Sequence, residues 1–186
     1  IVSLRFTCKV WLLHKLLKHQ GVLLETIVKG VRRILQKNER KIGSEAPAIS
    51  LVMQDRERKI IGMLATKVQV IITLPFHNSL SDSLLNIIQK YHDQAFIYLI
   101  SAQTLDQETN PTCSSTDFEE IAKKFGVYVD EELCAKAVFI INKDGQFVYK
   151  EIVEDVENEL ASQVNDYADI LKEELELVAS LKNLNK

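Results

Sequence analysis

The strongest constraint on the fold is one uninterrupted apolar run. Residues Val68–Leu74 read Val-Gln-Val-Ile-Ile-Thr-Leu, and Pro75 follows directly. The run is rich in β-branched residues and contains no charge, so it predicts a strand that is buried on both faces. A second such run, Ala95–Ile100, predicts a neighbouring strand. Between them, Leu84 to Tyr91 has helical apolar spacing, with Ser79 or Ser81 as the N-cap, so the sheet is expected to carry helices.

The remaining elements follow from turn residues and apolar periodicity. They are a hairpin of residues 22–29 and 31–36 around Gly30, two short segments Ile49–Val52 and Ile60–Leu64, a helix at about 116–125 ended by Gly126, a hairpin of Ala137–Asn142 and Gln146–Val153 around Asp144-Gly145, and a long C-terminal helix with apolar positions from Leu160 to Leu181. The order predicts an α/β domain with a mixed central β-sheet flanked by helices, which is the order of thioredoxin folds.

The first twenty residues form a separate basic segment in this interpretation. Apolar positions such as Leu12, Leu13 and Leu16 alternate with basic ones at helical spacing and predict an extra N-terminal amphipathic helix at about 8–19. Three roles stay open: packing on its own domain or a dimer partner, pairing with another protein, or lying on a membrane surface. The apolar stretch Val10–Leu24 is too short and too charged to span a bilayer. We therefore expect a helix in residues 1–20 and one thioredoxin-like domain in residues 21–186.

Charge and cysteine content exclude several function classes. Residues 1–42 carry ten Lys/Arg and two Asp/Glu (+8), whereas residues 43–186 carry thirteen and twenty-four (−11), which together give the net −3. An acidic main body without a basic stripe is a poor nucleic-acid binder. Three cysteines without short spacing indicate neither a disulfide framework nor a zinc ribbon, and they fit a reducing cytoplasm. The four histidines form no metal-binding pattern, so neither metal nor cofactor is expected.

Several local patterns occur in the order and spacing of one known family. The glycine at the turn of the first hairpin is the first of them, and the others are Gly43–Pro47 followed by Ile49–Val52, similar to G-x-x-A-P-x-F-x-L; Pro75–Asp82, similar to P-x-x-x-[ST]-x-x-C; and Leu133–Ile141, similar to the strand L-x-A-R-A-V-F-V-I. From about Thr26 to Leu171 the chain resembles the bacterial thiol peroxidases, the atypical two-cysteine peroxiredoxins. The resemblance implies a thioredoxin-like fold of the peroxiredoxin type, a hydroperoxide substrate, thioredoxin as reductant and a homodimer.

The resemblance also assigns the active-site positions. Pro75 and Ser79 match the family, Lys136 takes the place of its arginine, and Asp82 takes the place of its peroxide-attacking cysteine. In that reaction a thiolate attacks the O–O bond and becomes a sulfenic acid, which a carboxylate cannot do. Two arrangements stay open. Asp82 and Lys136 form an ion pair that imitates thiolate and arginine, or Asp82 only caps its helix and Lys136 points to solvent.

Cys113 and Cys134 are the remaining redox candidates, each with the alternative of a small buried apolar residue. The loop after Ile100–Gln103, which holds the family's resolving cysteine, is shorter here. Three functions therefore stay open. They are a degenerate peroxidase that acts by binding, an active thiol enzyme that uses Cys113 or Cys134, and a module that works through its N-terminal basic segment.

Overall fold

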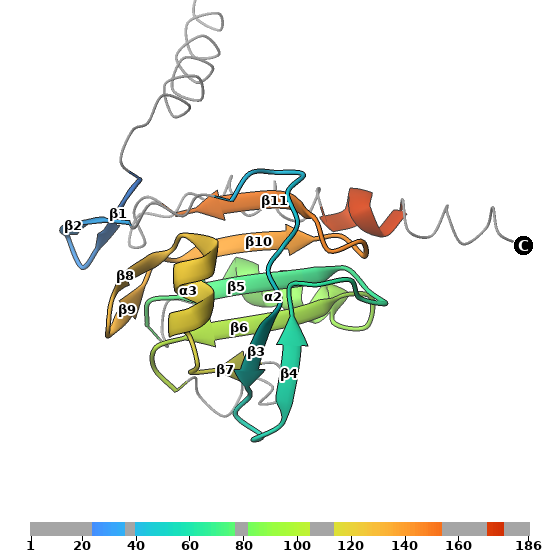
Figure 1. The fold of residues 1–186 in the computed structure, drawn as a ribbon, viewed down its shortest axis with the longest axis horizontal. Coiled ribbons are helices and arrows are strands. Elements are labelled where there is room, and N and C mark those ends of the chain that lie inside the picture. Colours follow the sequence, from blue (N-terminus) through green and yellow to red (C-terminus); the bar gives the residue numbers. More distant parts are fainter. Residues whose placement is uncertain (1–23, 36–39, 77–81, 105–113, 154–170, 177–186) are drawn as a thin grey trace, which may run out of the picture.

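The computed structural model describes residues 24–35, 40–76, 82–104, 114–153 and 171–176. Its core is one five-stranded mixed sheet (Figure 1). Its strand order is β11-β10-β5-β6-β7, with β5, β6 and β7 parallel and β10 antiparallel to both of its neighbours. The strands are β5 (Gln69–Leu74), β6 (Phe96–Ser101), β7 (Ser114–Ser115), β10 (Ala137–Ile141) and β11 (Phe147–Ile152). All six residues of β5 are buried, which confirms the buried central strand predicted from its composition.

Helices lie on both faces of this sheet. Helix α3 (Glu119–Phe125) lies in front of it in Figure 1, and α2 (Asp82–Tyr91) lies behind it. Alternate residues of β10 belong to the two sides. Phe139 packs with Phe125 of α3, whereas Val138 belongs to the same buried cluster as Tyr91 of α2 and Leu171 of the helical residues 171–176. The sheet therefore separates two apolar cores, as the composition of its strands requires.

Three hairpins surround the sheet. They are β1 (Glu25–Val28) with β2 (Val31–Ile34), β3 (Ile49–Val52) with β4 (Arg58–Ile61), and β8 (Tyr128–Asp130) with β9 (Leu133–Cys134). Lys29 and Gly30, which join β1 to β2, both have positive φ, 52° and 68°, as a tight two-residue hairpin loop requires. The predicted hairpin around Gly30 is therefore confirmed.

Three boundaries differ from the prediction. The segment Leu133–Ile141 is not one strand, because β9 pairs with β8 whereas β10 pairs with β5 and β11, and Ala135 and Lys136 lie between them. Helix α3 begins at Glu119 and not at 116, although it ends at Gly126 as predicted, with φ 76°. Strand β4 ends at Ile61 because Gly62, with φ 87°, turns the chain.

The two predicted terminal helices lie mainly outside the described residues. This holds for the segment at 8–19 and for the C-terminal helix, of which residues 171–176 are described and helical. Within the described ranges, no helix is both long and apolar enough to cross a membrane.

Gly62 is a position where only glycine fits. A Cβ atom built there would lie 2.2 Å from the carbonyl oxygen of Pro47, and the positive φ adds strain for any other residue. We expect Gly62→Ala to lower the free energy of unfolding by about 2–3 kcal/mol. Gly30→Ala is the control, because Gly30 has a similar φ but no atom within 4 Å of the added Cβ. Urea unfolding that shows equal losses for both variants would contradict the role given to the Pro47 contact.

Candidate functional site

Two of the predicted site residues, Pro75 and Lys136, lie at the carboxyl end of β5. β5 ends at Leu74, the buried Pro75 follows, and Asp82 is the first residue of α2. In open α/β sheets, ligands bind at the carboxyl ends of the parallel strands. Residues 77–81, which include Ser79, lie outside the described residues, so the turn is defined by its two ends.

Lys136 lies opposite the last residue of β5. Ala137 pairs with Thr73 in the antiparallel register of β10 and β5, so the next position outward sets Lys136 across from Leu74. The side chain is only 1% exposed. The arrangement in which Lys136 points to solvent is therefore wrong. A buried ammonium group is stable only when it is paired, so its surroundings must supply polar or charged partners.

Hydrogen bonds fix the backbone on both sides of Lys136. The Thr73 hydroxyl donates to the carbonyl oxygen of Ala135 at 2.8 Å, and the Cys134 thiol donates to the carbonyl oxygen of Leu74 at 3.4 Å. The Val153 N–H donates to the carbonyl oxygen of Lys136 at 2.9 Å. The short link between β9 and β10 is thus tied to the end of β5 and to the end of β11, which holds Lys136 at the site.

Cys134 is a buried thiol at this link. Burial raises the pKa of Cys134 from 9.0 to about 12. Reactive cysteines have lowered pKa values, because the thiolate is the nucleophile. The environment of Cys134 therefore suits a packed apolar residue better than a redox thiol. Cys113 lies outside the described residues.

We expect this shift to make Cys134 unreactive in the folded protein. At pH 8 a thiol with a pKa near 12 is ionised about a thousandfold less than a free cysteine, so we expect native Cys134 to resist iodoacetamide while the unfolded chain is labelled. Peptide mapping by mass spectrometry distinguishes Cys134 from the other cysteines. Rapid labelling of Cys134 in the native protein would contradict its burial.

The same thiol gives stability a dependence on alkaline pH. The folded state keeps the proton up to a pKa of about 12, whereas the unfolded state releases it near 9.0, so unfolding releases a proton between these values. Stability should therefore fall as the pH rises through this window. Cys134→Ser is the comparison, because it removes the group that titrates there.

The β1–β2 hairpin borders the site, which the sequence did not indicate. The buried Thr26 hydroxyl donates to the carbonyl oxygen of Val153 at 2.9 Å, and the N–H of the same Val153 donates to the Lys136 carbonyl oxygen. Lys29 Nζ lies 4.3 Å from the centroid of the ring of Phe76, which is the residue that follows Pro75. The only sequence signal for such contacts is a threonine inside a β-rich apolar run, as at Thr26 and Thr73.

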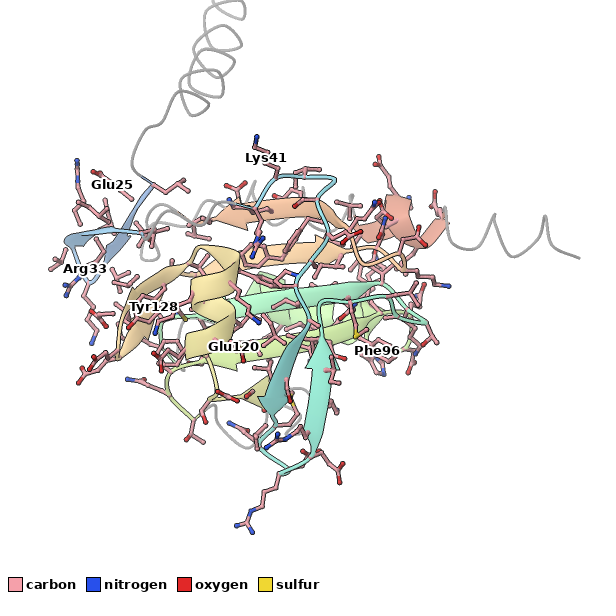
Figure 2. The ribbon with its side chains drawn as sticks, in the orientation of Figure 1. Glu25, Arg33, Lys41, Phe96, Glu120 and Tyr128 are labelled. Carbon is pink, nitrogen blue, oxygen red and sulfur yellow. The ribbon has the colours of Figure 1, made fainter. Side chains whose placement is uncertain are left out.

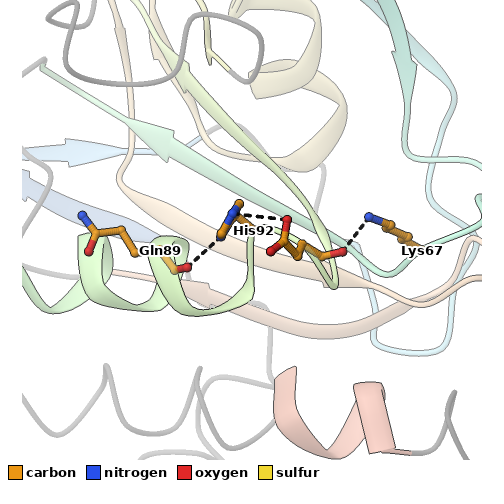
Figure 3. Close-up of polar contacts among 4 residues, drawn as sticks. Lys67, Gln89 and His92 are labelled. Carbon is orange, nitrogen blue, oxygen red and sulfur yellow. Dashed lines mark hydrogen bonds and ion pairs between the residues drawn. The ribbon is translucent and has the colours of Figure 1, made fainter.

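The opposite end of α2 holds the polar contacts in Figure 3, and they are not part of this site. His92 Nδ1 lies 2.8 Å from the Gln89 carbonyl oxygen, and His92 Nε2 lies 3.2 Å from Asp93 Oδ1. Lys67 Nζ donates to the carbonyl oxygen of Asp93 at 2.6 Å. These groups are exposed and close the helix end. No group of three His, Cys, Asp or Glu side chains suited to a metal ion occurs in the part of the chain that the structure describes.

Comparisons with known proteins agree with this architecture. No family model matches the chain. A thiol peroxidase from Aquifex aeolicus (strain VF5) is 27% identical over 152 residues, which cover 71% of this chain and 88% of that protein. The peroxiredoxin-like protein from Aquifex aeolicus superimposes with a TM-score of 0.62 at 24% identity and covers 81% of this chain and 99% of its own. The thiol peroxidase from Chromobacterium violaceum gives 0.63 at 11% identity, with 81% and 96% covered.

These likenesses confirm a peroxiredoxin-like thioredoxin fold with a mixed central sheet. In sequence, the chain is similar at distant identity to a thiol peroxidase.

Proposed function

We propose that this protein is a thiol-peroxidase-like chain that does not reduce hydroperoxides at residue 82 and that acts by binding. The observation that carries the proposal is the residue type at the start of α2. Asp82 follows the Pro75 turn at the position where the resemblance puts the peroxide-attacking cysteine. Peroxide reduction needs a sulfur atom that becomes a sulfenic acid, and a carboxylate has no corresponding oxidised state.

The state of Cys134 supports this proposal. A thiol with a pKa near 12 supplies almost no thiolate at neutral pH, so it is a poor substitute for the missing cysteine. The alternative, an active peroxidase that draws electrons from thioredoxin, then depends mainly on Cys113. The relatives suggest this alternative through their names, since both are thiol peroxidases.

We further propose that Asp82 and Lys136 form an ion pair that preserves the charge pattern of a thiolate and an arginine. Lys136 is buried opposite Leu74, and Asp82 begins the helix that follows the Leu74–Pro75 end of β5. A carboxylate there would be favoured by the helix N-terminus and by the ammonium group together. The site would then keep its shape without the redox step.

A coupled turnover assay tests the function directly. The wild-type chain is mixed with hydrogen peroxide or cumene hydroperoxide, thioredoxin, thioredoxin reductase and NADPH, with an active thiol peroxidase as the positive control. We expect NADPH oxidation at the rate of the mixture without the chain. Turnover that disappears with Cys113→Ser or Cys134→Ser would instead establish the alternative.

A further inference from the structure

We propose that the outer edge of β2 is a docking site for an extended acidic segment of a partner protein, which adds to the β1–β2 hairpin as a third strand. All four residues of β2 are exposed. Among the described residues, β2 pairs with β1 alone. This inference goes beyond the proposed function and does not depend on the chemistry of residue 82.

The pairing pattern shows which backbone groups are open. The tight loop makes Val28 and Val31 a hydrogen-bonded pair, and at the other end the Leu35 N–H donates to the Leu24 carbonyl oxygen at 2.8 Å. Because hydrogen-bonded and non-hydrogen-bonded pairs alternate in an antiparallel ladder, Arg32 and Ile34 are the intervening residues. Their N–H and C=O groups point away from β1. Two donors and two acceptors are therefore presented to an added strand.

The edge strands of the central sheet, in contrast, each pair with a further segment of the chain at one residue. At β11, the Gly43 N–H donates to the Phe147 carbonyl oxygen at 2.7 Å, and the Phe147 N–H donates to Ser44 at 3.0 Å. At β7, the Gln54 N–H donates to the Ser114 carbonyl oxygen at 2.8 Å. Proteins commonly cover or charge an exposed edge, because an open one recruits another strand. β2 is not covered in this way within the described ranges.

Charge determines which strand fits this edge. Residues 24–35 contain Lys29, Arg32, Arg33 and Glu25, a net charge of +2, and Figure 2 shows Arg33 and Glu25 at this end of the molecule. Arg32 Nη1 lies 3.2 Å from Glu25 Oε2, but both side chains are exposed, so this ion pair is weak. Two copies of β2 paired with each other would bring their arginines together, which is unfavourable. A strand with Asp or Glu is therefore preferred over a second copy.

Exposed apolar side chains also contribute to this surface. Val31 is 49% exposed and Ile34 is 56% exposed, and they flank the two arginines. The hairpin is also held against the rest of the domain, because the Thr26 hydroxyl donates a hydrogen bond to the Val153 carbonyl oxygen and Val28 is buried, with 3% of its surface exposed. The expected ligand is thus an extended segment in which two adjacent acidic residues are flanked by β-branched residues, and docking needs no rearrangement of the hairpin.

Fluorescence anisotropy with a labelled peptide tests the inference. The probe is Thr-Val-Glu-Glu-Val-Thr, and the control peptide has lysine in place of each glutamate. Ile34→Pro removes one outward N–H without changing the pairing with β1, and Arg32→Glu with Arg33→Glu reverses the charge. We expect each change to weaken binding at least about tenfold. Arg56→Glu with Arg58→Glu, an equal charge change at exposed positions of the β3–β4 hairpin, should leave binding unchanged.

Amide hydrogen exchange on the wild-type protein gives a second readout that does not need the variants to fold. Binding of the acidic peptide should slow exchange at the amides of Arg32 and Ile34. Equal affinity for the lysine peptide, or no added protection of these amides, would overturn the proposal. So would wild-type affinity in a folded Ile34→Pro variant, because attraction by the arginines alone would then explain the binding.

Discussion

Replacing Asp82 with cysteine should give the chain a peroxide-reactive thiolate that the wild-type protein lacks. A free cysteine with a pKa near 8.5 is about 3% thiolate at pH 7, whereas a pKa near 7 gives about 50%. Residue 82 begins α2, and the backbone that carries Lys136 is fixed across from the end of β5. A helix N-terminus and a nearby cation are the two features that lower the pKa of reactive cysteines. We therefore expect at least about fifteenfold more thiolate than in a free cysteine at pH 7.

Three variants measured side by side separate the causes of this gain. Asp82→Cys is compared with Asp82→Ser and with the double variant Asp82→Cys/Lys136→Met by thiolate absorbance at 240 nm, peroxide loss and trapping of sulfenic acid. The double variant should have a higher thiol pKa and a slower reaction than Asp82→Cys. If Asp82→Cys titrates near 8.5 and consumes peroxide no faster than Asp82→Ser, the assignment of the Pro75–Asp82 turn as the active-site turn is wrong.

Lys136→Met should lower the free energy of unfolding by about 3 kcal/mol, although methionine is close to lysine in size. The reason is that Lys136 is 1% exposed, and removal of one member of a buried pair leaves the other charge without compensation. Lys172→Met is the matched control. Lys172 is exposed and lies 3.8 Å from Glu176, so its loss should change stability by less than about 0.5 kcal/mol.

A double-mutant cycle with Asp82→Asn identifies the partner of Lys136. If the two residues form the proposed pair, the effects should be coupled by about 1–3 kcal/mol in urea unfolding. A large loss with Lys136→Met but no coupling would assign Lys136 to another partner. No loss at all would contradict the account of Lys136 as a buried, paired cation.

The sequence was most informative where one segment alone determines its environment. The run Val68–Leu74 indicated a strand buried on both faces because such strands consist almost entirely of apolar, β-branched residues. The hairpin around Gly30 was equally readable, since its loop needs positive φ. The break between β9 and β10 could not be predicted from the sequence. Both parts of Leu133–Ile141 are apolar, and they differ only in the strands with which they pair, β8 for β9 and β5 for β10.

The candidate site was predictable in residue identity but not in environment. Pro75 and Lys136 were assigned through the resemblance to the thiol peroxidases, and the structure brings both to the end of β5. A lysine is usually exposed, so the residue type alone did not predict that Lys136 is buried. The Thr73 hydroxyl that fixes the adjacent backbone was hidden inside an apolar run. Ser79 and Cys113 lie outside the described residues and stay predictions.

The most direct test of the account is whether the wild-type chain forms a sulfenic acid. The protein is treated with one equivalent of hydrogen peroxide in the presence of dimedone, and its intact mass is recorded beside that of Asp82→Cys. We expect the wild-type mass to stay unchanged over the time in which Asp82→Cys gains one adduct at residue 82. A stoichiometric adduct on Cys113 or Cys134 of the wild-type chain would contradict the proposal that peroxide chemistry has been lost.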